Sequence, residues 1–245
     1  MILCIDVGGS RMKWGLAGPH GWLQHGDVAH AQIGTLTLRD WQNLPRPSRV
    51  VGVNSAGEAQ RVRVEGQLAR WRSRVQWIKP VAKAGGVINE YLQGELAPDR
   101  WASLIAARRR ARDGADVHPC VVVNAGRSIT IDTLLADGRF SAGMMMPGLR
   151  AMLSALQNAL PQSHIDGGQW QRSPVNDADG AATGVVRAVC GAIESSRATI
   201  AGKDGDTAAR CFIGGGAASE IAPHLAPPVV VVDNLVLEGV LALAE

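Results

Sequence analysis

The sequence lacks long hydrophobic runs. Its apolar stretches, such as residues 229–232, end within a few residues at a charged residue or a turn former, whereas a membrane-spanning helix needs about 20 apolar residues in succession. The residues before Asp6 carry neither a basic flank nor an apolar stretch long enough for a secretory signal. We therefore expect a soluble, cytoplasmic protein without a membrane partner.

Cysteine pairs and the common nucleotide motifs are also missing. The four cysteines are far apart in the sequence: Cys4, Cys120, Cys190 and Cys211. They form no CxxC pair that could bind a metal together with a nearby His. We expect them to be buried, reduced thiols and not metal ligands. Neither GxxxxGK[ST] nor an early strand followed by GxGxxG occurs. These absences argue against the P-loop and Rossmann modes of nucleotide binding.

The chain has only a small excess of charge. Its net charge is +3 at pH 7, although most basic residues are Arg and cluster at residues 61–74 and 108–112. Binding to nucleic acid needs a broad positive surface. We therefore expect the two clusters to be solvated helix faces and expect no nucleic-acid partner.

An internal repeat of a short strand and turn is the most informative feature that is present. The chain has 245 residues, of which 46% are hydrophobic, enough for one large or two modest domains. One short apolar strand runs into Asp6-Val7-Gly8-Gly9-Ser10, and another, 118 residues later, runs into Asn124-Ala125-Gly126-Arg127-Ser128. The repeat aligns Ser10 with Ser128 and predicts two similar lobes.

The first of these turns has the composition of a phosphate site. Glycines let the backbone bend sharply and present amide groups to an anion. The Asp6 carboxylate at the strand end is a ligand type that Mg²⁺ prefers, and the Ser10 hydroxyl and Lys13 ammonium groups can meet phosphate oxygens. An ordinary hairpin turn has the same composition, so both interpretations remain open from the residues alone.

A later glycine run has a similar double interpretation. Gly214-Gly215-Gly216 follows the short apolar stretch 211–213 and precedes a predicted short helix at 217–225. A flat nucleobase could lie against this backbone. A plain strand-to-helix turn would have the same sequence.

An amphipathic helix is predicted over residues 101–112. Four residues recur at helical spacing and form one stripe: Trp101, Leu104, Ile105 and Arg108. Asp99 stands just before the helix, where an N-cap residue would stand. The same carboxylate is suited to accept the proton of an attacking hydroxyl group, beside an Arg100 guanidinium able to pair with a substrate carboxylate. The two roles are compatible.

The motifs together resemble those of the type III pantothenate kinases, including the group related to the Bvg accessory factor. The opening DxGNSxxKW of that family corresponds to residues 6–14. Its NGY and DRW motifs correspond to Asn89-Glu90-Tyr91 and Asp99-Arg100-Trp101. Its DxGTxxT turn corresponds to residues 124–130, and its GGxIxPG stretch to residues 142–148. Each motif is short, but their order along most of the chain makes the resemblance specific.

The resemblance implies an α/β, two-lobed actin-like fold of duplicated ribonuclease H-like domains, as in acetate kinase, sugar kinases and heat-shock ATPases. Residues 1–116 would form the amino-terminal lobe and residues 117–245 the carboxyl-terminal lobe, with the nucleotide between them. The implied reaction transfers the γ-phosphoryl group of ATP to the primary hydroxyl of pantothenate. The product is 4'-phosphopantothenate, and the reaction is the first step of coenzyme A biosynthesis.

The resemblance also implies residue roles. Asp99 would orient and deprotonate the hydroxyl group, and Asp6 and Asn124 occupy the cation positions. The implied ATP and phosphate contacts are Asp6, Gly8, Ser10, Lys13, Gly126, Arg127, Ser128 and, facing the adenine, Gly215. The implied pantothenate contacts are Asn89, Tyr91, Arg100 and Asp177. Family members are homodimers that use Mg²⁺ and a monovalent cation, K⁺ or NH₄⁺.

Several positions depart from the family pattern. Gly9 replaces an Asn and Gly216 replaces an Asp, and both leave small residues where the backbone makes the contacts. Three further departures bear on the chemistry. Asn124 replaces an Asp and removes a negative charge that would help to hold a cation. Arg127 replaces a small Thr, and would either grip the phosphates or fill their space. Asp177 replaces a Thr and would repel an anionic substrate. These departures leave open an alternative, a catalytically weakened homologue that acts as a nucleotide-binding regulatory protein. We expect an active kinase because four chemically important residues are intact: Asp6, Lys13, Asp99 and Arg100.

The remaining segments are expected to be scaffold. A continuous apolar helix face suits core or dimer packing and contains Leu149, Met152, Leu153, Leu156 and Leu160. A closing helix from residue 233 onward is expected to pack on the second lobe. None of the six histidines is assigned a role.

Overall fold

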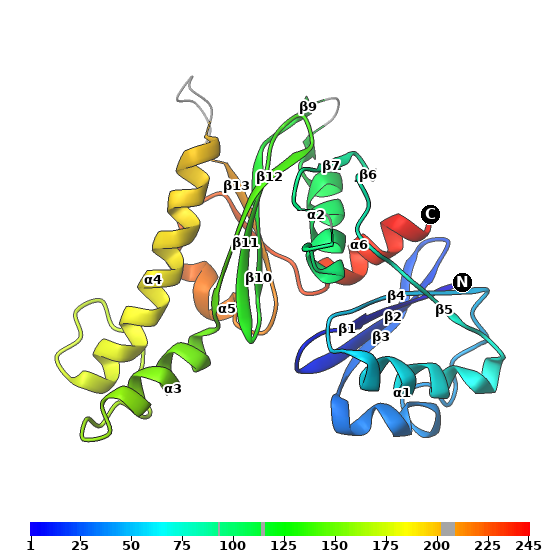
Figure 1. The fold of residues 1–245 in the computed structure, drawn as a ribbon, viewed down its shortest axis with the longest axis horizontal. Coiled ribbons are helices and arrows are strands. Elements are labelled where there is room, and N and C mark those ends of the chain that lie inside the picture. The colour runs from blue at the N-terminus through cyan, green and yellow to red at the C-terminus, as the bar shows by residue number, and fades with distance from the viewer. Residues whose placement is uncertain (93, 114–115, 202–208) are drawn as a thin grey trace. The chain divides into compact units, whose positions relative to one another are not determined.

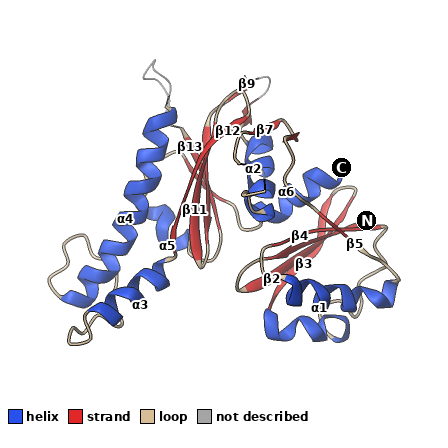
Figure 2. Cartoon of the chain, viewed as in Figure 1, coloured by secondary structure: helices blue, strands red, loops and turns tan. Residues whose placement is uncertain are grey.

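The computed structural model describes residues 1–92, 94–113, 116–201 and 209–245. Contacts divide the chain into two units. Unit 1 is Met1–Arg110 together with Asn234–Glu245, and unit 2 is Ala111–Asp233. Each unit combines a mixed β-sheet with helices (Figure 1; Figure 2).

Unit 1 contains a five-stranded sheet in the order β3-β2-β1-β4-β5. The strands are β1 (Ile2–Val7), β2 (Arg11–Gly18), β3 (Gly21–Ala29), β4 (Arg49–Asn54) and β5 (Val75–Trp77). The pairs β1/β2 and β2/β3 are antiparallel, whereas β1/β4 and β4/β5 are parallel. The other elements are the 3₁₀ helices η1 (His30–Leu38) and η2 (Ala69–Trp71), the hairpin β6 (Lys83–Ala84) and β7 (Val87–Asn89), and the helices α1 (Glu58–Leu68), α2 (Pro98–Arg110) and α6 (Leu235–Ala244).

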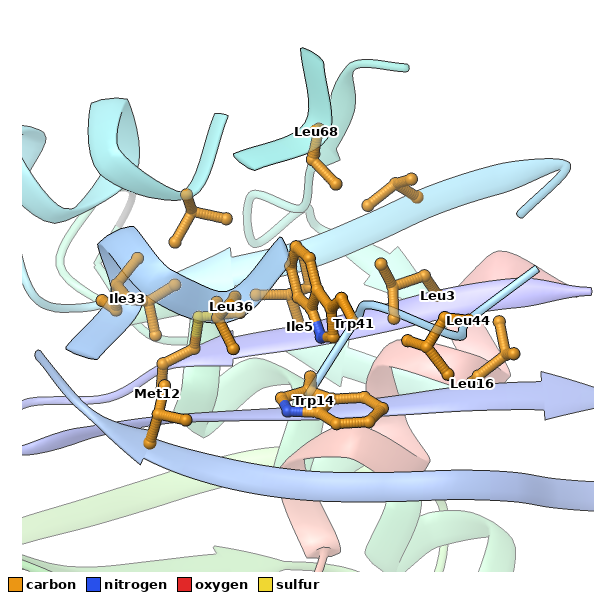
Figure 3. Close-up of a cluster of buried hydrophobic side chains, with 14 of the residues drawn as sticks. Leu3, Ile5, Met12, Trp14, Leu16, Ile33, Leu36, Trp41, Leu44 and Leu68 are labelled. Atoms are coloured by element: carbon orange, nitrogen blue, oxygen red, sulfur yellow. The ribbon is translucent and has the colours of Figure 1, made fainter. Parts of the chain in front are cut away.

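The two faces of this sheet pack against different elements. Side chains alternate along a strand, so Leu3 and Ile5 of β1 enter a core with Trp14 and with Trp41, which meets Trp14 edge to face (Figure 3). Cys4 points to the opposite face, where it packs with residues of α2 and α6. Asp6, two residues after Cys4, therefore lies on the α2 side of the sheet.

The expected position of the closing helix is wrong. Helix α6 forms, but it packs in unit 1, where Leu237 and Val240 join Cys4 and Ala102 in one buried cluster. A side chain at Gly239 would put a Cβ 1.8 Å from the carbonyl oxygen of Ala102, so only glycine allows this close approach of α6 to α2. An apolar helix pattern predicts burial and does not identify the partner.

Unit 2 repeats the topology of unit 1. Its strands are β10 (Cys120–Ala125), β11 (Ser128–Leu134), β12 (Arg139–Pro147), β13 (Arg210–Gly214) and β14 (Val229–Val231), and they run in the order β12-β11-β10-β13-β14. As in unit 1, the first two pairs, β10/β11 and β11/β12, are antiparallel, and the other two, β10/β13 and β13/β14, are parallel. The predicted duplication is thereby confirmed.

Helices and one hairpin complete unit 2. They are β8 (Arg112–Asp113), β9 (Asp116–Val117), α3 (Leu149–Ala159), α4 (Asp177–Ile200), α5 (Ala218–Ile221) and the 3₁₀ helix η3 (Ala222–His224). Val186 and Val189 of α4 and Ile221 of α5 pack on the β10 residues Val121 and Val123 to form the core. In Figure 2 the helices α4 and α5 lie on one side of the sheet, and α3 extends away from its lower end.

The strand registers of the two hairpins correct one detail of the predicted internal repeat. In unit 1 the pair Val7 and Met12 closes the first turn, whereas in unit 2 the pair Ala125 and Ile129 closes the second. The second turn is therefore one residue shorter. Ser128 begins its strand as Arg11 does, so the match of Ser128 with Ser10 is wrong.

The arginine clusters are only partly solvated. Arg110 forms an ion pair with Glu238 at 2.6 Å, and Arg61 forms one with Glu58 at 2.6 Å. Arg108 is buried inside α2, so the expected solvated face is wrong at this position. All four cysteines are buried as expected, and burial raises the pKa of Cys4 and Cys211 to about 12. Within the described ranges no helix combines the length and apolar content needed to cross a membrane.

Candidate active site

A buried carboxylate and a lysine stand side by side at the end of β1. Asp6 and Lys13 are cross-strand partners in the β1/β2 register, and side chains of such a pair project on the same face. Asp6 is 9% exposed, and its Oδ1 is buried without a hydrogen-bond partner among the described residues. An unsatisfied buried carboxylate oxygen is costly unless a cation or donor meets it.

Asp99 is the second acidic group of this site. The pKa of Asp6 is raised from 3.8 to about 7, first by burial and then by the negative charge of Asp99, while Lys13 acts in the opposite direction. Two carboxylates from different elements thus lie close enough to interact. Such a pair attracts a cation, and it resists full ionisation when no cation is present.

Asp99 lies inside the first turn of α2 and not at the N-cap position before it, although its Oδ1 accepts a hydrogen bond from the Arg100 N–H at 3.0 Å, as expected of a capping side chain. The Trp101 N–H donates to the Ala97 carbonyl, and Pro98 is the first helical residue, as proline commonly is. Asp99 is therefore the second helical residue, where the helix dipole favours a negative charge. Helix α2 is also buried over Arg100–Arg108 and not along one stripe only.

Three of the expected pantothenate contacts meet next to Asp99. The Tyr91 N–H donates to Asn89 Oδ1 at 3.0 Å, and the Arg100 guanidinium lies 5.0 Å from the centre of the Tyr91 ring. Arg100 is 4% exposed. This stacking fixes the plane of the guanidinium, so its position relative to a carboxylate ligand is already ordered.

The turn that follows β1 contains the expected phosphate contacts Gly8 and Ser10. Ser10 is exposed, and Gly8 and Gly9 are half-buried. A Cβ at Gly8 would lie 3.8 Å from Asp6 Oδ1 and 3.5 Å from the Arg11 carbonyl oxygen, so the backbone here passes close to the acid. His30, a residue that no sequence motif includes, places its Nε2 2.9 Å from the Gly8 carbonyl oxygen.

The second turn differs in its side chains. Gly126, Arg127 and Ser128 are all exposed. The Gly126 N–H donates to the Ser128 carbonyl at 3.0 Å, and the Gly148 N–H donates to the Arg127 carbonyl at 2.8 Å. Asn124, in place of an acid, has its Nδ2 3.5 Å from Thr130 Oγ1.

Gly215 packs against the strand that leads into this turn. Its φ is +101°, and a Cβ there would lie 2.4 Å from the Ala125 carbonyl oxygen. The Ala217 N–H donates to the same oxygen at 3.1 Å. Glycine is required at this position by its backbone conformation and by the close approach, and Gly215 and Gly216 are exposed.

Asp177 belongs to neither turn; it is the first residue of α4. It is exposed, and Asn176 caps the helix by accepting from the Asp179 N–H at 2.9 Å. A pocket of about 400 Å³ lies between α3 and α4, and Asp177 lines it with apolar residues that include Leu156 and Ile165. The structure thus places Asp177 at a pocket within unit 2.

The site residues therefore form local groups. In unit 1 the structure brings together Asp6, Lys13 and Asp99, and separately Asn89, Tyr91 and Arg100. In unit 2 the turn around Arg127 and the turn around Gly215 meet at Ala125. In the described ranges no three His, Cys, Asp or Glu side chains gather as metal ligands. A Mg²⁺ that keeps several waters and binds one or two carboxylates does not need such a cluster.

Comparisons with known families agree with the motif order. A family model described as type III pantothenate kinase matches residues 2–198. A type III pantothenate kinase of Nitrosospira multiformis is 39% identical over 246 residues, which cover 100% of this chain and 91% of the relative. One from Dechloromonas aromatica is 39% identical over 247 residues, covering 100% and 99%.

Solved structures show the same fold at low identity. A protein of Campylobacter jejuni described as a conserved Baf family transcriptional activator superposes with a TM-score of 0.61 at 18% identity, covering 97% of this chain and 94% of that one. A Sinorhizobium meliloti protein described as a 2-dehydro-3-deoxygalactonokinase has a TM-score of 0.62 at 12% identity, covering 100% and 96%. The fold is the two-lobed actin-like fold of sugar kinases.

Proposed function

Since this chain belongs to the type III pantothenate kinase family, we propose which of its residues carry out the phosphorylation of pantothenate, a step of coenzyme A biosynthesis. The enzyme is a kinase that transfers phosphate from ATP to pantothenate. The observation that carries the assignment is the buried Asp6 carboxylate, whose Oδ1 has no hydrogen-bond partner among the described residues and whose pKa the charge of Asp99 helps to raise.

Asp99 is the residue that handles the substrate hydroxyl. It accepts the proton of the attacking primary hydroxyl and aligns the oxygen with the phosphorus atom. A loose phosphoryl-transfer transition state asks little basicity of this group. Positioning and charge neutralisation contribute most of the acceleration.

Asp6 fits a divalent cation. Its Oδ1 is buried, has no described hydrogen-bond partner, and belongs to the hard oxygen ligands that Mg²⁺ prefers. Bound Mg²⁺ would neutralise charge on the ATP phosphates. Lys13, on the same face as Asp6, and the backbone around Gly8 and Ser10 would contact phosphate oxygens.

Arg100 and Tyr91 hold pantothenate. The Arg100 guanidinium, ordered by its stacking on Tyr91, pairs with the substrate carboxylate, and Asn89 orders the backbone at Tyr91. In unit 2 we assign Asp177 to the same substrate because it lines the pocket between α3 and α4. An acid there weakens the binding of an anion.

The second turn holds phosphates and, weakly, a monovalent cation. Gly126, Arg127 and Ser128 are exposed at the turn, and the exposed backbone at Gly215 would face the adenine. Asn124 offers a neutral amide oxygen where a carboxylate would hold K⁺ or NH₄⁺ more strongly. We therefore expect a high cation concentration to be needed for half-maximal activity. A titration with KCl and NH₄Cl at constant ionic strength tests this.

A homodimer is supported by the surface of α3. Leu149 is the only buried residue of this helix in unit 2, while Met152, Leu153 and Leu156 of its apolar face are half-covered and Leu160 is 48% exposed. A second copy of the chain would cover this face. Light scattering at micromolar concentration should give twice the chain mass of 25.8 kDa. We also place the enzyme in the cytoplasm, where ATP is supplied; cell fractionation tests this.

The regulatory alternative is not favoured, because relatives matched over the whole chain are pantothenate kinases. Purified protein with Mg-ATP, pantothenate and K⁺ or NH₄⁺ should release ADP in a pantothenate-dependent reaction. Asp99→Asn should lower this rate by at least about 1,000-fold, because the hydroxyl loses both its proton acceptor and its positioning group.

The control is Glu95→Gln, an exposed acid outside the site, which should keep the parental rate. A fully active Asp99→Asn enzyme would refute the role of Asp99. A parent protein without pantothenate-dependent ADP release under any monovalent salt would favour the regulatory alternative.

A further inference from the structure

We propose that His30 is a positioning residue for ATP, which holds the first phosphate turn in its binding conformation by donating a hydrogen bond to the Gly8 carbonyl. His30 is half-buried at the start of η1, and its Nε2 lies 2.9 Å from that oxygen. A carbonyl oxygen only accepts hydrogen bonds, so Nε2 must carry the proton. This role rests on the proposed function of the turn.

The hydrogen bond controls an amide as well as a carbonyl. The Gly8 C=O and the Gly9 N–H belong to one planar trans peptide, in which they point in opposite directions. Holding the carbonyl on His30 therefore holds the Gly9 N–H away from His30. Gly8 and Gly9 flank this peptide, and two glycines leave it free to rotate between conformations. A side-chain donor is thus needed where the turn lacks stiff residues.

The topology explains why a residue after β3 reaches this turn. Arg11, the first residue of β2, pairs with Ala29, the last residue of β3. The residue that follows β3 consequently stands beside the turn between β1 and β2. No local pattern around His30 indicates this neighbour, which is 22 residues away in sequence.

Unit 2 contains a similar contact, made by a backbone donor to a different carbonyl of its turn. Ser128, the first residue of β11, pairs with Pro147, the last residue of β12. Gly148 is therefore the topological equivalent of His30, and its backbone N–H donates to the Arg127 carbonyl at 2.8 Å. In both units the residue after the third strand hydrogen-bonds a carbonyl of the phosphate turn. The recurrence in two unlike sequences supports a function in shaping the turn.

Steady-state kinetics of two variants test this inference. His30→Ala removes the donor and should raise the KM for Mg-ATP about tenfold, the effect of one lost hydrogen bond, while the KM for pantothenate stays within twofold. His30→Gln keeps an N–H donor and should stay within about threefold of the parent. His25→Ala, at an exposed histidine of β3, should match the parent.

Two results would overturn the inference. One is a parental KM for Mg-ATP in His30→Ala. The other is an equal rise in both KM values that His30→Gln does not reverse, because a merely structural role would have that effect.

A spectroscopic measurement is independent of turnover. The ¹⁵N NMR spectrum of the ring should show His30 as the tautomer protonated at Nε2, and the Nδ1-protonated tautomer would refute the hydrogen bond. If the parent protein were inactive, the proposed function would fail. Direct binding of Mg-ATP to the parent and to His30→Ala, together with the tautomer, would still decide the role of His30.

Discussion

The two units present the same turn with opposite electrical character. In unit 1 the acid Asp6 is the penultimate residue of β1, and the arginine that opens the next strand, Arg11, is paired with Asp27. In unit 2 the neutral Asn124 is the penultimate residue of β10, and the exposed Arg127 occupies the turn itself. Under the proposed function, one backbone topology would therefore supply the Mg²⁺ ligand in unit 1 and a basic phosphate contact in unit 2.

The difference teaches how a duplicated fold separates two tasks. A kinase must bind the triphosphate of ATP and must also neutralise its charge. Binding phosphate directly requires positive side chains, whereas holding the neutralising cation requires a negative one. The backbone of the turn can serve both because its amides are common to both copies. Side chains at the strand end and in the turn then decide which task each copy performs.

Exchanging the strand-end residues should break the comparison most strongly. Asp6→Asn should lower kcat/KM for Mg-ATP about 100-fold, because the cation loses its carboxylate. Asn124→Asp should change it by less than about fivefold and should lower the K⁺ concentration needed for half-maximal activity. Steady-state kinetics with a KCl titration measure both. Similar losses in the two variants would mean that the turns do not differ in function.

The stability of unit 1 should depend on pH through Asp6. The pKa of Asp6 is raised to about 7 in the folded protein from 3.8, so the folded state binds this proton more tightly than the unfolded state. Stability should therefore fall as the pH rises from about 4 to 7. Without divalent cations at pH 8, Asp6→Asn should melt roughly 5 °C above the parent.

Below about pH 4 this difference should vanish, and saturating Mg²⁺ at pH 8 should reduce it. Calorimetry across this pH range measures the effect, with the exposed Asp40→Asn as the matched control. A difference in melting temperature that does not change with pH would contradict the raised pKa.

Removing the basic residue of the second turn should have a smaller effect. Arg127→Thr should raise the KM for Mg-ATP about tenfold, since a charge-assisted hydrogen bond to phosphate is lost. Arg172→Thr, at an exposed arginine of unit 2, is the control and should be neutral. If Arg127→Thr were faster than the parent, the guanidinium would be filling the phosphate space.

The smallest expected effect is at Asp177. Asp177→Thr should lower the KM for pantothenate two- to fivefold, because an exposed acid repels an anionic substrate only through solvent. The gain should shrink in high salt, and the KM for Mg-ATP should not change. A KM for pantothenate that is insensitive to this substitution would remove Asp177 from the substrate site.

Much of the fold could be predicted from the sequence because it depends on local order. The internal repeat around Asp6 and Asn124 requires only an apolar strand followed by a glycine turn. Both hairpins form at the positions that this repeat predicts. The helix containing Trp101 forms for the same reason. The Asp99 side chain accepts from a first-turn amide as predicted, but Pro98 starts the helix one residue earlier, so Asp99 is not the N-cap residue. The first residue of a helix is defined by backbone hydrogen bonds, which the sequence pattern does not show.

By itself the sequence determined the strands, the two turns, the motif order and the intact acids, since these are properties of short segments. Only the tertiary structure decided the charge coupling of Asp6 with Asp99, the packing of α6 on α2, the true equivalence of Ser128 with Arg11 and the contact of His30 with Gly8. Each of these depends on strand register or on helix packing, which join residues that are far apart along the chain.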